Sequence, residues 1–166
     1  MSEQPPEPLA PRATSWMIRP LEPEDEEAAA ALLAACTYEG TIERGRGLLE
    51  QLRADDDSNI YGMSDHGDLV AVYVTRRAPM SLEVAYLVVG PAFRRQGYGR
   101  ACLQDALRRA GRRPLVVETD DEGLPFYQAC GFKLIGRRKH PGGTVRYRLG
   151  WHTPRPRPPA APNRPA

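Results

Sequence analysis

The hydrophobic positions along the chain fall into two spacings, one typical of strands and the other of helices. Near the N-terminus, a short apolar stretch predicts a strand that ends at Pro20. Pro23 then suits the first position of a helix, and the four acidic residues after it suit the positive end of the helix dipole. An alanine-rich run continues this helix. A second helix follows, although Gly45 and Gly47 weaken the prediction.

The rest of the pattern alternates strands and helices. The segment Ser81–Val89 is apolar on nearly both faces except at Glu83, which predicts a strand in the centre of a sheet. The predicted strands are Ser15–Arg19, Asn59–Ser64, Leu69–Arg76, Ser81–Val89, Leu115–Thr119, Phe132–Arg138 and Thr144–Trp151. The predicted helices are Pro23–Cys36, Thr41–Arg53, a helix that carries Leu103, Ala106, Leu107 and Ala110 and ends at Gly111, and Leu124–Cys130. This order predicts an α/β domain in which helices cover one mixed sheet.

Composition limits this domain to residues 15–151. Of the 17 prolines, four fall in residues 1–14 and six in residues 154–166, so we expect disordered tails at 1–14 and 152–166. The domain itself is electrically neutral, because the excess charge lies in the tails, and this argues against nucleic-acid binding through bulk electrostatics. The sequence holds no apolar run long enough to span a membrane and no secretory signal. Three scattered cysteines indicate reduced thiols in a cytoplasmic protein.

One segment carries specific chemistry, at residues 89–100. A buried strand leads into a loop rich in arginine and glycine, and the loop leads into a helix whose first backbone N–H groups are free to bind phosphate oxygens. Gly97 and Gly99 would let a pyrophosphate approach the backbone closely. Seven arginines and one acid, Asp105, lie between Arg94 and Arg113, which indicates a ligand with several phosphates. A solvated basic helix face after an ordinary turn would give the same pattern.

Two motifs resemble those of the GNAT superfamily of N-acetyltransferases. Arg94-x-x-Gly97-x-Gly99, after Leu87-x-Val89-x-Pro91, is similar to the loop that binds the pyrophosphate of acyl-CoA. The segment Phe126–Phe132 is similar to the second signature, an aromatic-Tyr pair followed by Gly-Phe. The order of elements fits across residues 17–150. The resemblance implies a GNAT-like fold with a mostly antiparallel sheet, one splayed parallel pair and helices on both faces.

The resemblance also implies acetyl-CoA as co-substrate, without a metal. Its pantetheine arm would enter between the splayed strands and pair with the backbone of Leu87, Val88 and Val89 as an added strand does. The pyrophosphate would be held by the loop and the first turn of the following helix, that is by Arg94, Arg95, Gln96, Gly97, Tyr98, Gly99 and Arg100. His66 and His140 lie in predicted turns, which explains both without a metal.

Acetyl transfer to an amine needs an acid and a base. Tyr127 matches the tyrosine that resembling enzymes use to protonate the departing thiolate, although it would also serve as a core aromatic. Glu83 lies four residues before Leu87 on the central strand and is the first candidate for the base. Glu118 is the second candidate. A chain of water molecules that removes the proton would make neither carboxylate essential.

The chain departs from the family pattern at Asp120 and Gly123, where Asn and Ala are common, which puts a side-chain contact from Asp120 to the cofactor in doubt. The acidic run 118–122 would either favour a cationic amine or remain solvated. The acceptor is a primary amine of unidentified nature, on a small molecule or a protein, and residues 36–53 and the turn near Met80 are expected to shape its site. The alternative function is that of a non-catalytic acyl-CoA-binding module. A homodimer is a possible assembly.

Overall fold

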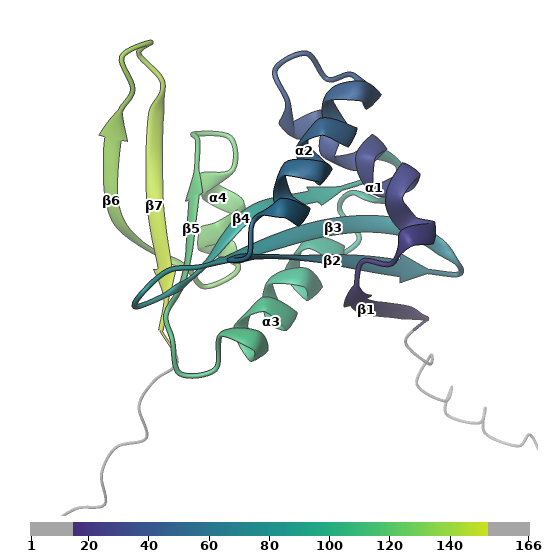
Figure 1. The fold of residues 1–166 in the computed structure, drawn as a ribbon. Helices are drawn as coiled ribbons and strands as arrows, with labels where there is room; N and C mark the ends of the chain where they lie inside the picture. The colour runs from purple at the N-terminus through teal and green to yellow at the C-terminus, as the bar shows by residue number, and fades with distance from the viewer. Residues whose placement is uncertain (1–14, 153–166) are drawn as a thin grey trace, which may run out of the picture.

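A seven-stranded mixed sheet organises the chain (Figure 1). The computed structural model describes residues 15–152. Along the sheet the order is β1-β2-β3-β4-β5-β7-β6. The strands are β1 (Trp16–Pro20), β2 (Ser58–Asp65), β3 (Asp68–Arg77), β4 (Leu82–Val89), β5 (Leu115–Thr119), β6 (Lys133–Lys139) and β7 (Val145–Trp151). All seven predicted strands are therefore present, within two residues of their predicted bounds.

The parallel pair that the resemblance implies is β4 and β5, and it is splayed. Pairing between them covers only Leu82 with Leu115, Glu83 with Val116 and Val84 with Val117. The register of β3 with β4 then shifts between Val74 and Thr75, as a bulge does when it bends a strand. Every other strand pair is antiparallel. The predicted fold class is confirmed, and β4 has no parallel partner beyond Val84.

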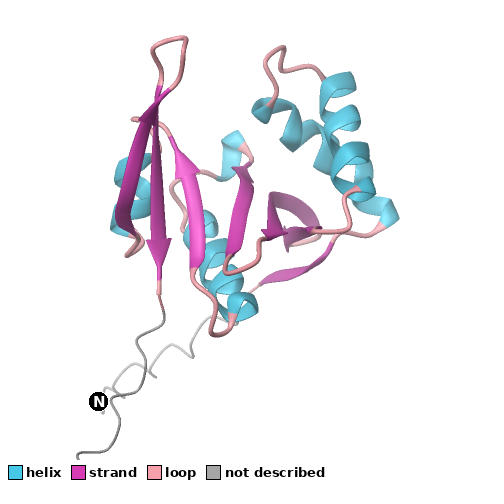
Figure 2. Cartoon of the chain, turned by 60° about the vertical axis from the view of Figure 1, so that its left-hand side comes forward, coloured by secondary structure: helices cyan, strands magenta, loops and turns pink. Residues whose placement is uncertain are grey.

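Helices cover both faces of the sheet. The longer helices are α1 (Glu26–Leu33), α2 (Ile42–Ala54) and α3 (Tyr98–Ala110), and α4 (Leu124–Ala129) is a short one. Alternation along β3 divides the core, because Val72 and Val74 pack against α1 and α2 whereas Ala71 and Tyr73 belong to the cluster on α3. Figure 1 shows α1 and α2 on the opposite side of the sheet from α3. Figure 2 shows the same arrangement from a second direction.

The first two helices differ in detail from their predictions. The predicted helix Pro23–Cys36 is divided into a 3-10 turn at Pro23–Asp25, α1, and a second 3-10 turn at Ala34–Cys36. The second begins after Thr41, whose Oγ1 accepts a hydrogen bond from Arg44 N at 3.3 Å. Gly45 lowers helix propensity but is needed for packing, since a Cβ there would lie 2.0 Å from the carbonyl oxygen of Ala30.

Two predictions concern the ends of the chain. Residues 1–14 and all but the first residue of the predicted C-terminal tail, 152–166, lie outside the described residues. Within residues 15–152, no helix is both long and apolar enough to cross a membrane.

Candidate active site

The loop between β4 and α3 presents a row of backbone N–H groups. Arg95 and Gly97 have positive φ angles of 62° and 88°, and Gly97 caps the N-terminus of α3 in the left-handed conformation. The first amide of the helix to find a backbone acceptor is that of Ala101, which donates to Gly97 O at 3.1 Å. The amides before it, at the first turn of α3, therefore remain available to an anion.

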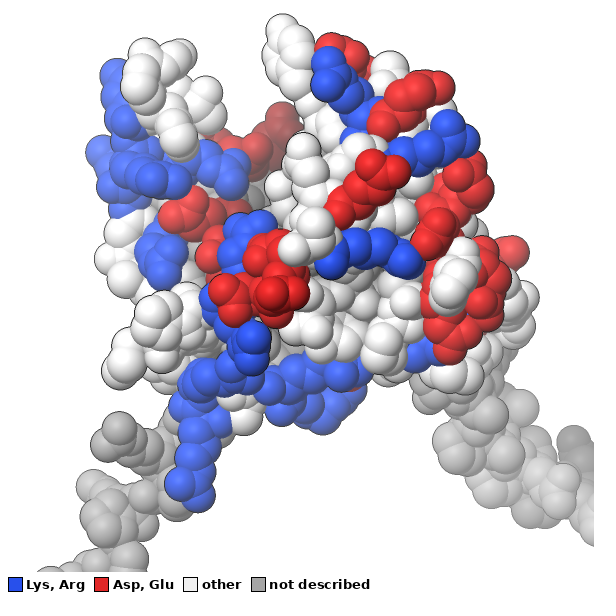
Figure 3. Space-filling view, viewed as in Figure 1, with Lys and Arg blue, Asp and Glu red and all other residues white. Residues whose placement is uncertain are grey.

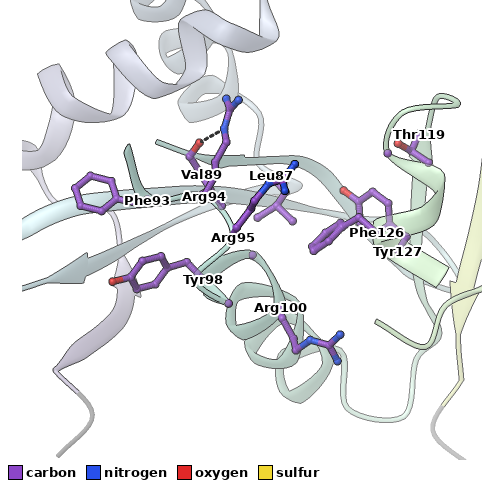
Figure 4. A pocket seen from close by; sticks show the side chains of 13 residues that line it. Leu87, Val89, Phe93, Arg94, Arg95, Tyr98, Arg100, Thr119, Phe126 and Tyr127 are labelled. Carbon is purple, nitrogen blue, oxygen red and sulfur yellow. Dashed lines mark hydrogen bonds between the residues drawn. The ribbon is translucent and has the colours of Figure 1, made fainter. Parts of the chain in front are cut away.

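A cavity of about 500 Å³ lies beside this loop, between β4, α3 and α4 (Figure 4). Eight of the ten residues predicted to bind the cofactor line it: Leu87, Val89, Arg94, Arg95, Gly97, Tyr98, Gly99 and Arg100. The other two do not. Val88 is buried, and the side-chain amide of Gln96 donates to Ala92 O at 3.3 Å. A size of several hundred Å³ with an apolar lining and a charged rim fits an extended, phosphorylated ligand.

Sequence reasoning missed four residues of this lining. Phe93, Thr119, Gly123 and Phe126 complete the wall. Phe126 is the one that a sequence signal identifies, because it opens the second motif. A Cβ on Gly99 would lie 3.1 Å from Phe126 Cζ, so this glycine keeps α3 and α4 close together. Gly99 therefore has a packing role in addition to the predicted close approach to a pyrophosphate.

The seven arginines of residues 94–113 do not act as one basic patch, and that interpretation is corrected. Only Arg94, Arg95 and Arg100 line the cavity. Arg108 and Arg109 instead form ion pairs with the buried Asp105, at 3.0 and 2.7 Å. The same carboxylate accepts a hydrogen bond from the hydroxyl of Tyr73. Helical spacing of three and four residues explains these pairs.

Two of the lining arginines are engaged with the backbone. Arg94 Nε donates to the carbonyl oxygen of Val89 at 3.3 Å, the bond drawn in Figure 4. Arg100 Nη2 donates to the carbonyl oxygen of Ala129 at 3.2 Å and so ties α3 to the end of α4. Arg95 lines the cavity without such a bond among the described residues. Positive charge is thus present at the rim, while free amides supply the fixed donors.

A second cavity, of about 390 Å³, adjoins the first on the side of α1 and α2. Leu87, Thr119 and Tyr127 line both. Of the regions expected to shape the acceptor site, Cys36 lines this second cavity. Met80 is exposed and lines neither of the two cavities. The two spaces meet at Tyr127, which sits at the passage between them.

Tyr127 is held at this passage by aromatic packing. Its ring makes edge contacts with Phe126 and with Phe132, with centroid separations of 5.1 and 5.8 Å. Burial raises the pKa of its phenol to about 12, and the nearby Cys130 and Cys36 act in the same direction. Among the described residues none forms a hydrogen bond with the hydroxyl. The phenol is therefore protonated at neutral pH and free to donate to a ligand.

The two candidate bases lie in different surroundings. Glu83 pairs with Arg76 of β3 and Val116 of β5 in the sheet register, before the strands separate. It lines neither cavity. Glu118 lines the second cavity beside Tyr127, and its carboxylate forms ion pairs with Arg138 at 3.0 Å and Arg148 at 3.6 Å. The role of either carboxylate as base stays a prediction.

The departures from the family pattern, Asp120 and Gly123, have a common local cause. The Oδ1 atom of Asp120 accepts hydrogen bonds from the backbone N–H groups of Glu122 and Gly123, at 3.1 and 3.0 Å. A Cβ on Gly123 would lie 2.0 Å from Thr119 Oγ1. The threonine hydroxyl thus occupies the space of an alanine methyl, and the aspartate closes the turn before α4.

Three of the four carboxylates in the acidic run 118–122 have partners within the fold. Glu118 is ion-paired, Asp120 binds backbone amides, and Asp121 accepts a hydrogen bond from the Tyr147 hydroxyl at 2.6 Å. Glu118 and Asp120 line the second cavity, and the neutral backbone amides that bind Asp120 leave its negative charge in place. Selection of a cationic amine by this run stays a prediction.

Comparisons with known proteins agree with the motifs. The model of a family described as an acetyltransferase (GNAT) domain matches residues 54–134, from the end of α2 into β6. No curated protein matches the sequence. Among solved structures, an aminoglycoside 6'-N-acetyltransferase complexed with coenzyme A is similar with a TM-score of 0.73 and 14% identity, over 85% of this chain and 99% of that one.

Two further structures show the same fold. A GNAT family acetyltransferase from Elizabethkingia anophelis with acetyl-CoA bound has a TM-score of 0.64 and 21% identity, over 85% of this chain and 100% of that one. The ribosomal-protein-S18-alanine N-acetyltransferase from Escherichia coli has a TM-score of 0.64 and 19% identity, over 82% and 93%. The matched segment and the fold are similar to those of GNAT acetyltransferase domains. The chain is an acyltransferase by class.

Proposed function

We propose that the protein transfers the acetyl group of acetyl-CoA directly to a primary amine, without a covalent enzyme intermediate. One observation carries the proposal: Leu87, Thr119 and Tyr127 line both cavities. A thioester that extends from the Arg94–Gly99 loop along β4 would therefore meet an amine from the second cavity at Tyr127. The similar structures with coenzyme A or acetyl-CoA bound support this choice of co-substrate.

The chain would hold acetyl-CoA mainly with its backbone. Free amides at the start of α3 would accept the pyrophosphate, and Arg94 and Arg95 would add positive charge. The edge of β4 beyond Val84 has no parallel partner, so the pantetheine arm would pair there as an added strand. The carbonyl oxygen of Val89 accepts a hydrogen bond from Arg94, and this hydrogen bond would have to break if the pantetheine arm pairs with Val89.

The chemical step forms a bond between the amine nitrogen and the acetyl carbon and breaks the C–S bond. The amine must first lose a proton, and the sulfur that leaves carries the negative charge. Tyr127 would donate a hydrogen bond, and then a proton, to that sulfur. Its raised pKa keeps the donor present throughout the neutral range.

Two carboxylates are candidates for the base that takes the proton from the amine. Glu83 on the central strand is the first candidate, and a water chain would have to connect it to the amine because it lines neither cavity. Glu118 lines the second cavity directly but already forms ion pairs with two arginines. The names of two similar structures, which specify an aminoglycoside and an alanine of ribosomal protein S18, support an amine as the acceptor.

We retain a cytoplasmic location as part of the proposal. Cys36, Cys102 and Cys130 are all free thiols, as expected in a reducing compartment.

Release of free CoA thiol tests the proposed function. Purified protein is incubated with acetyl-CoA and a panel of primary amines, and thiol is followed together with the mass of the acetylated product. Amine-dependent release that falls in Tyr127→Phe would support acetyl transfer. Tight acetyl-CoA binding without release for any amine would instead support the alternative, a non-catalytic acyl-CoA-binding module.

A further inference from the structure

The face of β5, β7 and β6 beside the second cavity gathers arginines around one carboxylate. Arg138 Nη2 lies 3.0 Å from Glu118 Oε2, and Arg148 Nη1 lies 3.6 Å from Glu118 Oε1. Arg146 Nη2 donates to the backbone carbonyl of Glu118 at 3.4 Å. Arg137 lines the same space. Two arginines thus pair with the Glu118 carboxylate and two more line the same cavity, and we call Arg137, Arg138, Arg146 and Arg148 the hairpin arginine cluster.

The sheet register forces these charges together. Arg138 stands directly opposite Arg146 in the antiparallel β6–β7 pair, and like charges in opposite positions destabilise a sheet. Figure 3 shows blue side chains gathered over the β6–β7 hairpin at the left of the view, with a hollow between the hairpin and α1–α2. The Glu118 carboxylate offsets part of this repulsion, and a bound anion would offset more of it.

The cluster is continuous with the acceptor side of the active site. It lines a cavity of about 220 Å³, and two of the lining residues, Glu118 and Arg146, also line the second cavity that reaches Tyr127. Arg146 is half-buried between them. An acceptor whose amine lies at Tyr127 would therefore extend its other end toward the arginines. The cavity of about 220 Å³ is lined by four arginines and one acid, Glu118, so the surplus charge there is positive.

We propose that the acceptor is a small amine that carries an oxyanion, a carboxylate or a phosphate, at its far end, and that the hairpin arginine cluster binds this group. The inference rests on the proposed function, because it names the substrate class of the same site. A guanidinium suits both oxyanions, since it offers two parallel N–H groups to two oxygens. Polyamines would be repelled by the same charges. Arg138 and Arg148 are 63% and 45% exposed, so solvent screens each contribution.

A panel of acceptors with matched chain length tests the substrate class. Each set contains an ω-amino carboxylate, its carboxamide, the corresponding aminoalkyl phosphate and the diamine. The expected result is a kcat/KM at least about tenfold higher for the carboxylate or the phosphate than for the amide, carried mainly by KM. Comparison of the ω-amino carboxylate with the aminoalkyl phosphate distinguishes the two oxyanions. The proposal would be overturned if the carboxamide had the same kcat/KM as the oxyanion acceptors, or if the diamine had a higher one.

A double variant, Arg138→Gln with Arg148→Gln, locates the binding group. It should lower the preference for the oxyanion to about twofold or less, while the rate with the carboxamide changes little. The matched control is Arg112→Gln, an exposed arginine beyond the end of α3 that should keep the full preference. A preference that survives the double variant would place the oxyanion elsewhere and contradict the proposal.

A binding measurement separates this inference from the proposed function. Inorganic phosphate is titrated into labelled protein, and the backbone amide signals of Gly136 and Arg146 are followed by NMR. We expect saturable shifts in the wild type that the double variant loses. Such shifts without amine-dependent CoA release would retain the anion site and reject the acetyl transfer. Absence of shifts at millimolar phosphate would overturn the anion site even if acetyl transfer occurs.

Discussion

Arg94 donates a hydrogen bond from Nε to the carbonyl oxygen of Val89, 3.3 Å away. The bond joins two residues for which the resemblance implies separate contacts with acetyl-CoA, the arginine with the pyrophosphate and the strand backbone with the pantetheine arm. Ligand binding at both positions would require this bond to break. The loop cation is therefore held by the protein before any ligand arrives, and its net contribution to binding is reduced.

Replacement of Arg94 should consequently have a modest effect. We expect Arg94→Ala to weaken acetyl-CoA binding by less than about tenfold, because the new contact of a charged hydrogen bond, about 1.5–3 kcal/mol, is offset by the bond that must be broken. Calorimetric titration measures this, with Arg112→Ala as a control for loss of one positive charge. A loss of a hundredfold or more would show that Arg94 is a dominant phosphate ligand.

Tyr127→Phe should separate binding from catalysis. Removal of one hydroxyl from the passage between the cavities leaves the aromatic packing on Phe126 and Phe132 in place. We expect kcat to fall at least about a hundredfold, the lower end of the range for loss of an acid–base group, while the acetyl-CoA dissociation constant changes less than about threefold. Undiminished turnover would remove Tyr127 from the mechanism.

The raised pKa of Tyr127 gives a prediction for the pH profile. A phenol with a pKa of about 12 stays protonated as the pH rises past the ordinary value near 10. Activity that depends on this proton is therefore retained above pH 10 and is lost only as the pH approaches 12. We expect kcat for the wild type to show no falling limb below about pH 10.5. Fixed-time assays at pH values where the enzyme remains folded measure this. A falling limb centred at pH 8–9 would contradict this assignment.

Paired glutamine variants should identify the base. Glu83→Gln and Glu118→Gln each remove a carboxylate without a large change in shape. If Glu83 acts through water, its variant should lower kcat at least about tenfold and flatten the acid limb of the pH profile. Glu118→Gln should mainly alter KM for the acceptor, because its carboxylate organises Arg138 and Arg148. An unchanged profile in both variants would favour a water chain alone.

Gly45 tests the packing of α1 on α2. Alanine at Gly45 would place a Cβ 2.0 Å from Ala30 O, so the helices must separate. We expect Gly45→Ala to lower the free energy of unfolding by about 1–3 kcal/mol, as overpacking does. The control is Gly47→Ala on the same helix, where no atom lies within 4 Å of the added Cβ. That change should raise stability by about 0.5–1 kcal/mol through helix propensity. Urea unfolding compares the two, and equal effects would contradict the close packing.

The fold was predictable because periodicity and the two motifs act locally. Thr41 marks the start of α2, and Gly97 marks the left-handed cap of α3, each through short-range chemistry. Helical spacing is also sufficient to predict the pairing of Asp105 with Arg109, four residues apart on α3. Local rules of this kind need no knowledge of which strands become neighbours.

The parts that could not be predicted depend on tertiary register. Thr119 fills the space at Gly123 only because the turn after β5 folds back on the strand end. The ion pairs of Glu118 with Arg138 and Arg148 join three strands that lie side by side as β5-β7-β6, an order that differs from their order in the sequence. No pattern in the sequence fixes that register, so these partners of Glu118 could not be recognised.

The central claim is that acetyl-CoA binds where the Arg94–Gly99 loop meets α3, and calorimetric titration of acetyl-CoA into wild type and Gly97→Glu tests it most directly. Gly97 has a φ of +88°, and so does Gly143 in the β6–β7 turn, so Gly143→Glu controls for backbone strain and added charge. We predict micromolar binding, about −8 kcal/mol, in the wild type and in Gly143→Glu, and none in Gly97→Glu. A folded wild type that does not bind, or a Gly97→Glu variant that binds as the wild type does, would contradict the account.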